Sequence, residues 1–184
     1  NVVVLKPDLR MAVSGGLFLA AVLEEAGLPA GLLHVLPGGQ EVGSALVEEV
    51  GVRVISFTGS TRAGRAVGES AGLWLTRVYL ELGGNSALIV LDDVDVQAAV
   101  SAGAWGSFLH QGQICMTTGR HLVHESIYDE YVERLSATAD GIPVGDPTSG
   151  VPLGPVIDAG QRDRIHDLVT RSPDSGAPLT AGGT

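Results

Sequence analysis

The sequence is poor in cysteine, in basic residues and in long apolar runs. It has one cysteine among 184 residues, so no disulfide can form within the chain, as is usual in a reducing cytoplasm. Lys and Arg total 11 against 21 Asp and Glu, a net charge of −10. This argues against a nucleic-acid partner, because neutralising phosphates requires a basic surface. No window approaches ~18 uninterrupted apolar residues, so no membrane span is predicted. The first residues also lack a signal-peptide pattern. We therefore expect a cytoplasmic protein without nucleic-acid or membrane partners.

Both ends of the chain fall inside structural patterns. Residues 1–5 open directly in an apolar, β-branched run, and residues 179–184 stop just after a turn signal. We therefore expect this sequence to be an internal piece of a longer protein.

Short aliphatic runs alternate with helical patterns along the chain. The runs are apolar on both faces and the connectors are rich in glycine, which predicts an α/β fold with a parallel sheet covered by helices on both sides. The pair Gly83-Gly84 predicts a boundary between two domains, residues 1–82 and 83–184. Strands are expected at 2–5, 33–36, 53–57, 77–82, 87–91 and 120–124, and helices at 12–26, 41–50, 62–71, 94–108, 128–139 and 158–171.

A first candidate for chemistry is the stretch FTGSTRAG, residues 57–64, which closes a strand and opens a helix. The amide groups and the dipole of such a helix start favour a bound phosphate. The alternative is a strand-to-helix turn with an ordinary Ser or Thr cap.

A second candidate is Glu81 in ELGGNS, at the end of an apolar strand. Burial there would raise the pKa of this carboxyl and make it a usable general base near neutral pH. The alternative is a glutamate that simply faces solvent.

The third candidate is the single cysteine, Cys115, in HQGQICMTTGR. It lies among small and polar residues between Gly112 and Gly119, whereas structural cysteines usually lie among aliphatic side chains. The setting predicts an irregular loop whose backbone approaches a substrate. The alternative is an inert buried thiol.

These three motifs, in this order and at these separations, resemble the NAD(P)-dependent aldehyde dehydrogenase superfamily. The segments LKP after the first strand and LPAGLLHVLPGG before the second motif are also similar to that family. ELGGNSALIVLDD and AWGSFLHQGQICMTTGRHLVH are most similar to its benzaldehyde and vanillin dehydrogenase branch. The resemblance covers essentially all of the chain.

The resemblance implies oxidation of an aldehyde, aromatic in this branch, to the carboxylic acid. It makes Cys115 the nucleophile, whose thiolate attacks the carbonyl to give a thiohemiacetal while the Cys115 N–H helps to stabilise the oxyanion. Hydride transfer to the nicotinamide then leaves a thioester. It makes Glu81 the base that activates water for hydrolysis of this thioester.

The resemblance also implies a Rossmann-like NAD(P)-binding domain at residues 1–82, a catalytic domain at 83–184, both incomplete, and a homodimer or homotetramer. The cofactor is NAD or NADP, since Leu9 stands where many NAD-preferring members carry a glutamate that binds the ribose 2′-hydroxyl. The implied cofactor-binding residues are Lys6 at the adenosine ribose, Gly59, Ser60 and Gly64 along the pyrophosphate, Leu82 facing the nicotinamide through its backbone, and Gly39.

Two other functions remain open at this point. One is a CoA-acylating dehydrogenase of the same superfamily, which Glu81 argues against, because that branch tends to lack this base. The other is a non-catalytic paralogue that acts as an oligomer partner, which would most plausibly have lost Cys115 or Glu81. The family's upstream oxyanion-hole asparagine and downstream ribose-binding stretch are absent, so the 184 residues alone are expected to be inactive.

No metal site is predicted. His121 and His124 lie three apart, so on a regular strand they would face opposite sides. Asp92, Asp93 and Asp95 have the pattern of a helix-capping acidic turn.

Overall fold

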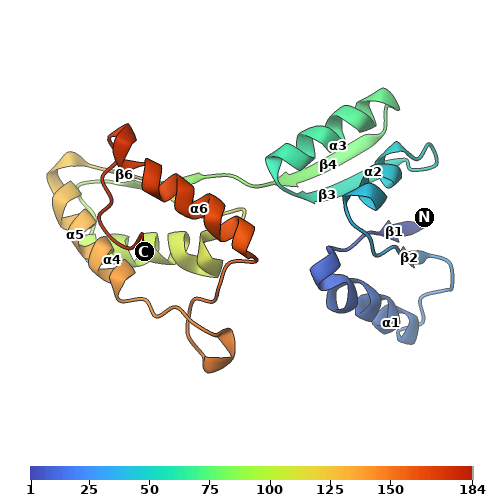
Figure 1. Cartoon of the computed structure of the whole chain (residues 1–184), viewed down its shortest axis with the longest axis horizontal. Coiled ribbons are helices and arrows are strands. Elements are labelled where there is room, and N and C mark those ends of the chain that lie inside the picture. Colours follow the sequence, from blue (N-terminus) through green and yellow to red (C-terminus); the bar gives the residue numbers. More distant parts are fainter. Residues whose placement is uncertain (184) are drawn as a thin grey trace. The chain divides into compact units, whose positions relative to one another are not determined.

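The computed structural model describes residues 1–183 and divides into two compact units, the first Asn1–Leu82 and the second from Gly83 onward. Both units are built from parallel strands and helices (Figure 1). None of the helices formed by residues 1–183 has the length and apolar character that a membrane span requires.

The first unit contains two parallel strand pairs, β1 with β2 and β3 with β4. Helix α3 packs along the second pair (Figure 1). The expected first helix begins as a π-helical turn, Ala12–Leu17, before it continues as α1. In chain order the elements are β1 Val3–Leu5, α1 Phe18–Glu25, β2 Leu33–Val35, α2 Gln40–Glu48, β3 Val54–Gly59, α3 Thr61–Leu73 and β4 Arg77–Leu82.

The second unit contains one parallel pair, β5 with β6, and a small apolar core where helices α4 and α5 pack together. Val100 and Tyr131, each 1% exposed, are the most deeply buried large side chains of this core. Its elements are β5 Ser86–Val90, α4 Val96–Phe108, β6 Thr118–Val123, α5 Tyr128–Asp140 and α6 Ala159–Arg171.

The predicted α/β fold with parallel strands is confirmed, and all six expected strands are present. The expected cover on both faces is not met within residues 1–183. Successive strand residues face opposite sides, and one side of the β3–β4 pair and of the β5–β6 pair is exposed. Tyr79 in β4 is 64% exposed, and Ile89 in β5 is 67% exposed. Helices cover only the other side of these pairs.

A β-bulge interrupts β6 at Gly119, four residues after Cys115. Ser86 pairs with Thr118 and the next residue of β5, Ala87, pairs with Arg120, so Gly119 has no partner in the ladder. An extra residue in one strand shifts the alternation of its side chains. Thr118 and His121, three residues apart, therefore both lie on the partly buried side of β6, which faces helix α4.

Two glycines of α4 make room for these inner side chains. A Cβ on Gly106 would overlap the Thr118 hydroxyl, and one on Gly103 would overlap the Tyr131 hydroxyl and lie 3.0 Å from Cε1 of His121. The two glycines lie three apart and hence on one face of the helix. They let α4 approach β6 and α5 closely.

We predict that Gly103→Ala destabilises the protein. Overpacking against the buried Tyr131 costs about 1–3 kcal/mol, which exceeds the ~0.5–1 kcal/mol gained by removing a helical glycine. Chemical denaturation of the full-length protein measures the change. The control is Gly68→Ala in α3, where the nearest atom to the new Cβ is a Leu80 methyl at 3.8 Å. Equal stability of the two variants would contradict the packing described here.

Candidate functional site

Cys115 is exposed on a tight turn between α4 and β6. The amide of Thr117 donates to the Ile114 carbonyl at 3.0 Å, which makes Cys115 the second residue of a four-residue turn. The Ile114 amide in turn donates to Oγ1 of Thr117 at 3.2 Å. We call residues 114–117 the cysteine turn. Both of its ends are held by hydrogen bonds, while Cys115 is exposed.

The backbone before the cysteine turn is strained. His110, Gln111 and Gly112 have φ of 50°, 58° and 68°, a conformation that costs about 1–2 kcal/mol per non-glycine residue. Gly112 also lacks space, since a Cβ there would lie 2.9 Å from the Ser107 carbonyl oxygen. The His110 carbonyl accepts from the Gln113 amide at 3.0 Å, which closes this left-handed segment.

The Gln111 side chain ties this segment to the later loop of the second unit. With its amide oriented to satisfy its hydrogen bonds, Gln111 donates to the His110 carbonyl at 3.0 Å and accepts from the Gly154 amide at 2.9 Å. Strained backbone of this kind is concentrated at functional sites. The strain here lies within the five residues that precede Cys115.

The start of the second unit runs beside the cysteine turn. The Ser86 amide donates to the Thr117 carbonyl at 3.1 Å, and Asn85 Oδ1 occupies the place that a Cβ on Gly119 would take. A Cβ on Gly84 would lie 3.7 Å from the Cys115 carbonyl oxygen. The GGNS segment that follows Glu81 and Leu82 is therefore a direct neighbour of the cysteine turn.

Glu81 and Leu82 end strand β4. The register pairs Glu81 with Thr58 and Leu82 with Gly59, so both lie at the carboxyl edge of the β3–β4 pair. Glu81 is exposed within its unit, so the burial expected for its carboxyl is not observed there. The Leu82 side chain packs on α3, where it occupies the space that a Cβ on Gly64 would need.

Ser60 is the N-cap of α3. Its hydroxyl accepts from the Ala63 amide at 3.2 Å, and its carbonyl accepts from the Gly64 amide at 2.8 Å. The Ser cap, which the sequence left open as the alternative to a phosphate site, is present. Gly59 has an internal reason to be glycine, since a Cβ there would lie 2.6 Å from the Phe57 ring. The β3–β4 register and the start of α3 place five of the predicted residues at the carboxyl edge of this strand pair: Gly59, Ser60, Gly64, Glu81 and Leu82.

Lys6 and Gly39 meet at the ends of β1 and β2. The half-buried Lys6 ammonium donates to the Pro7 and Gly38 carbonyls at 2.9 and 3.0 Å. The Gly39 amide donates to the Glu41 carboxylate at 3.0 Å. Backbone amides of Glu41 itself and of Gly39, and then the nearby Lys6 charge, hold the pKa of Glu41 below its usual value. Amide donors and a fixed ammonium at the carboxyl ends of parallel strands suit the hydroxyl and phosphate groups of a dinucleotide.

The predicted site residues are shared between the two units. Cys115 belongs to the second unit, and the other seven belong to the first. Within the described residues no group of three potential metal ligands occurs. Asp95 caps α4 by accepting from the Ala98 amide at 2.8 Å, which confirms the expected capping turn.

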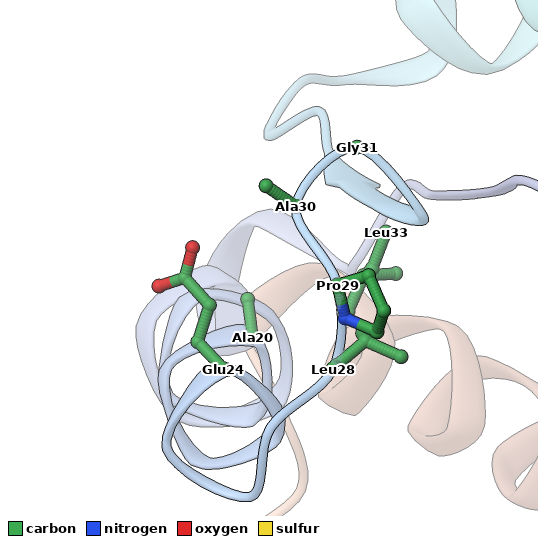
Figure 2. A pocket seen from close by; sticks show the side chains of 7 residues that line it. All are labelled: Ala20, Glu24, Leu28, Pro29, Ala30, Gly31 and Leu33. Atoms are coloured by element: carbon green, nitrogen blue, oxygen red, sulfur yellow. The ribbon is translucent and has the colours of Figure 1, made fainter.

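The first unit also has a small cavity of about 80 Å³ beside α1. Figure 2 shows that it lies between this helix and the loop to β2, and none of the predicted site residues lines it. Its lining residues are Ala20, Glu24, Leu28, Pro29, Ala30, Gly31 and Leu33.

Sequence reasoning missed a polar cluster behind the cysteine turn, formed by Ser107, Thr118, His121 and Tyr131. From the sequence, His121 is weighed only as a metal ligand on a regular strand. The available signal was Gly119, since a glycine inside a strand pattern often marks a bulge.

Comparison with known proteins places the whole chain in one family. Residues 1–184 match the aldehyde dehydrogenase family. The chain is 72% identical to a vanillin dehydrogenase of an Amycolatopsis species and 52% identical to the benzaldehyde dehydrogenase [NAD(+)] of Pseudomonas putida, covering 100% of this chain and 38% of each relative.

Solved structures give the same result. Lactaldehyde dehydrogenase from Escherichia coli matches with a TM-score of 0.94 at 33% identity, covering 100% of this chain and 39% of that one. An aldehyde dehydrogenase from Pseudomonas syringae, solved with NAD+ and octanal, matches with a TM-score of 0.93 at 35% identity, covering 99% and 38%. The chain thus spans little more than a third of the length of these relatives, and over that length it belongs to the aldehyde dehydrogenase family.

Proposed function

We propose that the full-length protein oxidises an aromatic aldehyde to the carboxylic acid with NAD or NADP. The observation that carries this proposal is the exposed Cys115 thiol on a turn anchored at both ends, in a chain of this family. The names of the two relatives given above, a vanillin and a benzaldehyde dehydrogenase, support the aromatic substrate.

Cys115 is the nucleophile in this proposal. Its thiolate adds to the aldehyde carbon, and the carbonyl electron pair moves to oxygen, where the Cys115 N–H donates a hydrogen bond. When bound, NAD or NADP supplies the hydride acceptor that this oxidation needs. The exposed Cys115 is accessible to an aldehyde, and a fixed backbone keeps its amide aimed at the oxyanion.

Glu81 is the base that completes the reaction. It takes a proton from the water that attacks the Cys115 thioester, the C–S bond breaks, and the acid leaves while the thiolate is regenerated. The GGNS segment that follows Glu81 borders the cysteine turn, which supports a shared role for the two motifs.

We further propose that residues 1–82 bind the cofactor and that residues 83–184 belong to the catalytic domain. The ammonium of Lys6 would bind the adenosine ribose together with Gly39, and the α3 start at Gly59, Ser60 and Gly64 would bind the pyrophosphate. The Leu82 backbone would face the nicotinamide. A homodimer or homotetramer in the cytoplasm is part of the proposal.

We expect Cys115→Ser in the full-length protein to lower kcat for benzaldehyde oxidation by at least about 1,000-fold. A serine hydroxyl is scarcely ionised at neutral pH, so the nucleophile is lost. Steady-state assays with and without added CoA measure the effect, and fluorescence titration serves as the control, since NAD affinity should stay nearly unchanged. Substantial remaining turnover would refute the assignment. A wild type that turns over only with CoA would identify the acylating reaction instead.

Glu81→Gln should separate acylation from deacylation. We expect a burst of reduced cofactor, close to one equivalent per active site, and then a stall, because water is no longer activated to attack the thioester. Stopped-flow absorbance records the burst. The control is Glu48→Gln on the exposed side of α2, which should turn over normally. Loss of the burst itself would show that Glu81 acts before the thioester forms.

The cofactor preference should be weak. Without a carboxylate at Leu9, which is 59% exposed, kcat/KM for NAD and NADP should agree within roughly tenfold, or ~1.4 kcal/mol. Leu9→Glu should shift the preference toward NAD by repelling the 2′-phosphate. If the wild type already rejects NADP by orders of magnitude, the prediction is wrong, and Glu41→Gln would then test whether the carboxylate beside Lys6 is responsible.

A further inference from the structure

We propose that His121 is a positioning residue for Cys115, which acts through Ser107 and the Thr118 carbonyl to fix the end of the cysteine turn. The proposal rests on the proposed role of Cys115 as nucleophile. It assigns a function to the polar cluster of Ser107, Thr118, His121 and Tyr131, none of which touches the thiol directly in the contacts described above.

The distances define one directed chain of hydrogen bonds. Oγ of Ser107 lies 2.7 Å from the Thr118 carbonyl, which can only accept, so the hydroxyl donates there. Nε2 of His121 lies 2.9 Å from the same Oγ and 3.2 Å from the same carbonyl. Since the single hydroxyl proton is already used, Nε2 must carry a proton and donate it.

Tyr131 fixes the other side of the His121 ring. With its proton on Nε2, the neutral ring offers Nδ1 as an acceptor, and the Tyr131 hydroxyl donates to it at 2.8 Å. Tyr131 is 1% exposed, and burial raises the pKa of its phenol, so this hydroxyl keeps its proton. The two rings also meet edge to face, with centroids 5.7 Å apart. Position and tautomer of His121 are thereby set.

The chain of hydrogen bonds ends at the residue that follows the cysteine turn. The Thr117 carbonyl is held by the Ser86 amide of β5, whereas the Thr118 carbonyl is held by the side chain of Ser107 on α4. Consecutive carbonyls are thus bound to elements on different sides, at the point where the bulge at Gly119 interrupts the ladder. Where the strand pairing is interrupted, the side chains of Ser107 and His121 donate to the Thr118 carbonyl. These hydrogen bonds fix the backbone that follows the cysteine turn.

Two conservative substitutions separate positioning from mere packing. The amide nitrogen of Gln reaches the place of Nε2, so His121→Gln keeps a donor for Ser107. The oxygen of Asn reaches the place of Nδ1, so His121→Asn keeps the acceptor for buried Tyr131 but loses the donor. If His121 only accepts the hydrogen bond of Tyr131, His121→Asn should retain more activity than His121→Gln. If His121 positions the cysteine turn, His121→Gln should retain more activity.

The experiment uses the full-length protein with benzaldehyde and NAD. We expect His121→Asn to lower kcat by at least about tenfold with KM within roughly threefold, since displacement of the nucleophile by ~1 Å can cost up to about 100-fold. His121→Gln should stay within roughly threefold of the wild type. Ser107→Ala, which leaves the Tyr131–His121 bond in place, should reproduce the loss and carries the test if His121→Asn does not fold.

A second readout does not depend on turnover. Iodoacetamide labelling followed by peptide mapping gives the alkylation rate of Cys115, which should change by at least about threefold in His121→Asn and Ser107→Ala, because the cysteine and its backbone amide lose their fixed geometry, but not in His121→Gln. Equal effects of Asn and Gln on both readouts, or none, would overturn the proposal. If the three variants label as expected yet the wild type oxidises no aldehyde, the proposed function fails while the positioning of the turn stands.

Discussion

The β-bulge at Gly119 is the constraint on which the geometry around Cys115 depends. By adding one unpaired residue to β6, it places Thr118 and His121 on the same side of the strand, facing the glycines of α4. It also breaks the backbone ladder right after the cysteine turn. A regular strand would have bound the backbone with its neighbour and sent one of these two side chains outward. At the bulge the Thr118 carbonyl instead accepts from the Ser107 hydroxyl of α4, while Cys115 remains exposed.

Strand register has the same role in the first unit. Parallel pairing of β3 with β4 puts Thr58 opposite Glu81 and Gly59 opposite Leu82, and the chain then enters α3 at Ser60. Residues some twenty positions apart in the sequence thus arrive at one edge. Ligands of open α/β sheets bind at the carboxyl ends of strands, which is where this register places the proposed cofactor residues.

Much of this arrangement follows from local sequence pattern. Apolar runs separated by glycine predicted the strands and helices, and the caps at Ser60 and Asp95 followed from short-range hydrogen-bonding rules. The proposed roles of Cys115 and Glu81 came from motif resemblance. The left-handed backbone at His110 and Gln111 could not be predicted, because neither residue type requires it and packing imposes it. The cluster around His121 was missed because the expected strand, 120–124, left Thr118 outside it, and only the tertiary register shows that the strand begins at Thr118 and skips Gly119.

In the proposed reaction the exposed Cys115 on the cysteine turn carries the substrate as a covalent adduct. The most direct measurement is rapid chemical quench of the wild-type full-length protein mixed with benzaldehyde and NAD, followed by digestion and mass spectrometry. We expect the peptide containing Cys115 to gain the mass of a benzoyl group within the first turnover, and the adduct to decay as benzoate appears. Benzoate formed without any acyl label on Cys115, or with the label on another residue, would contradict it.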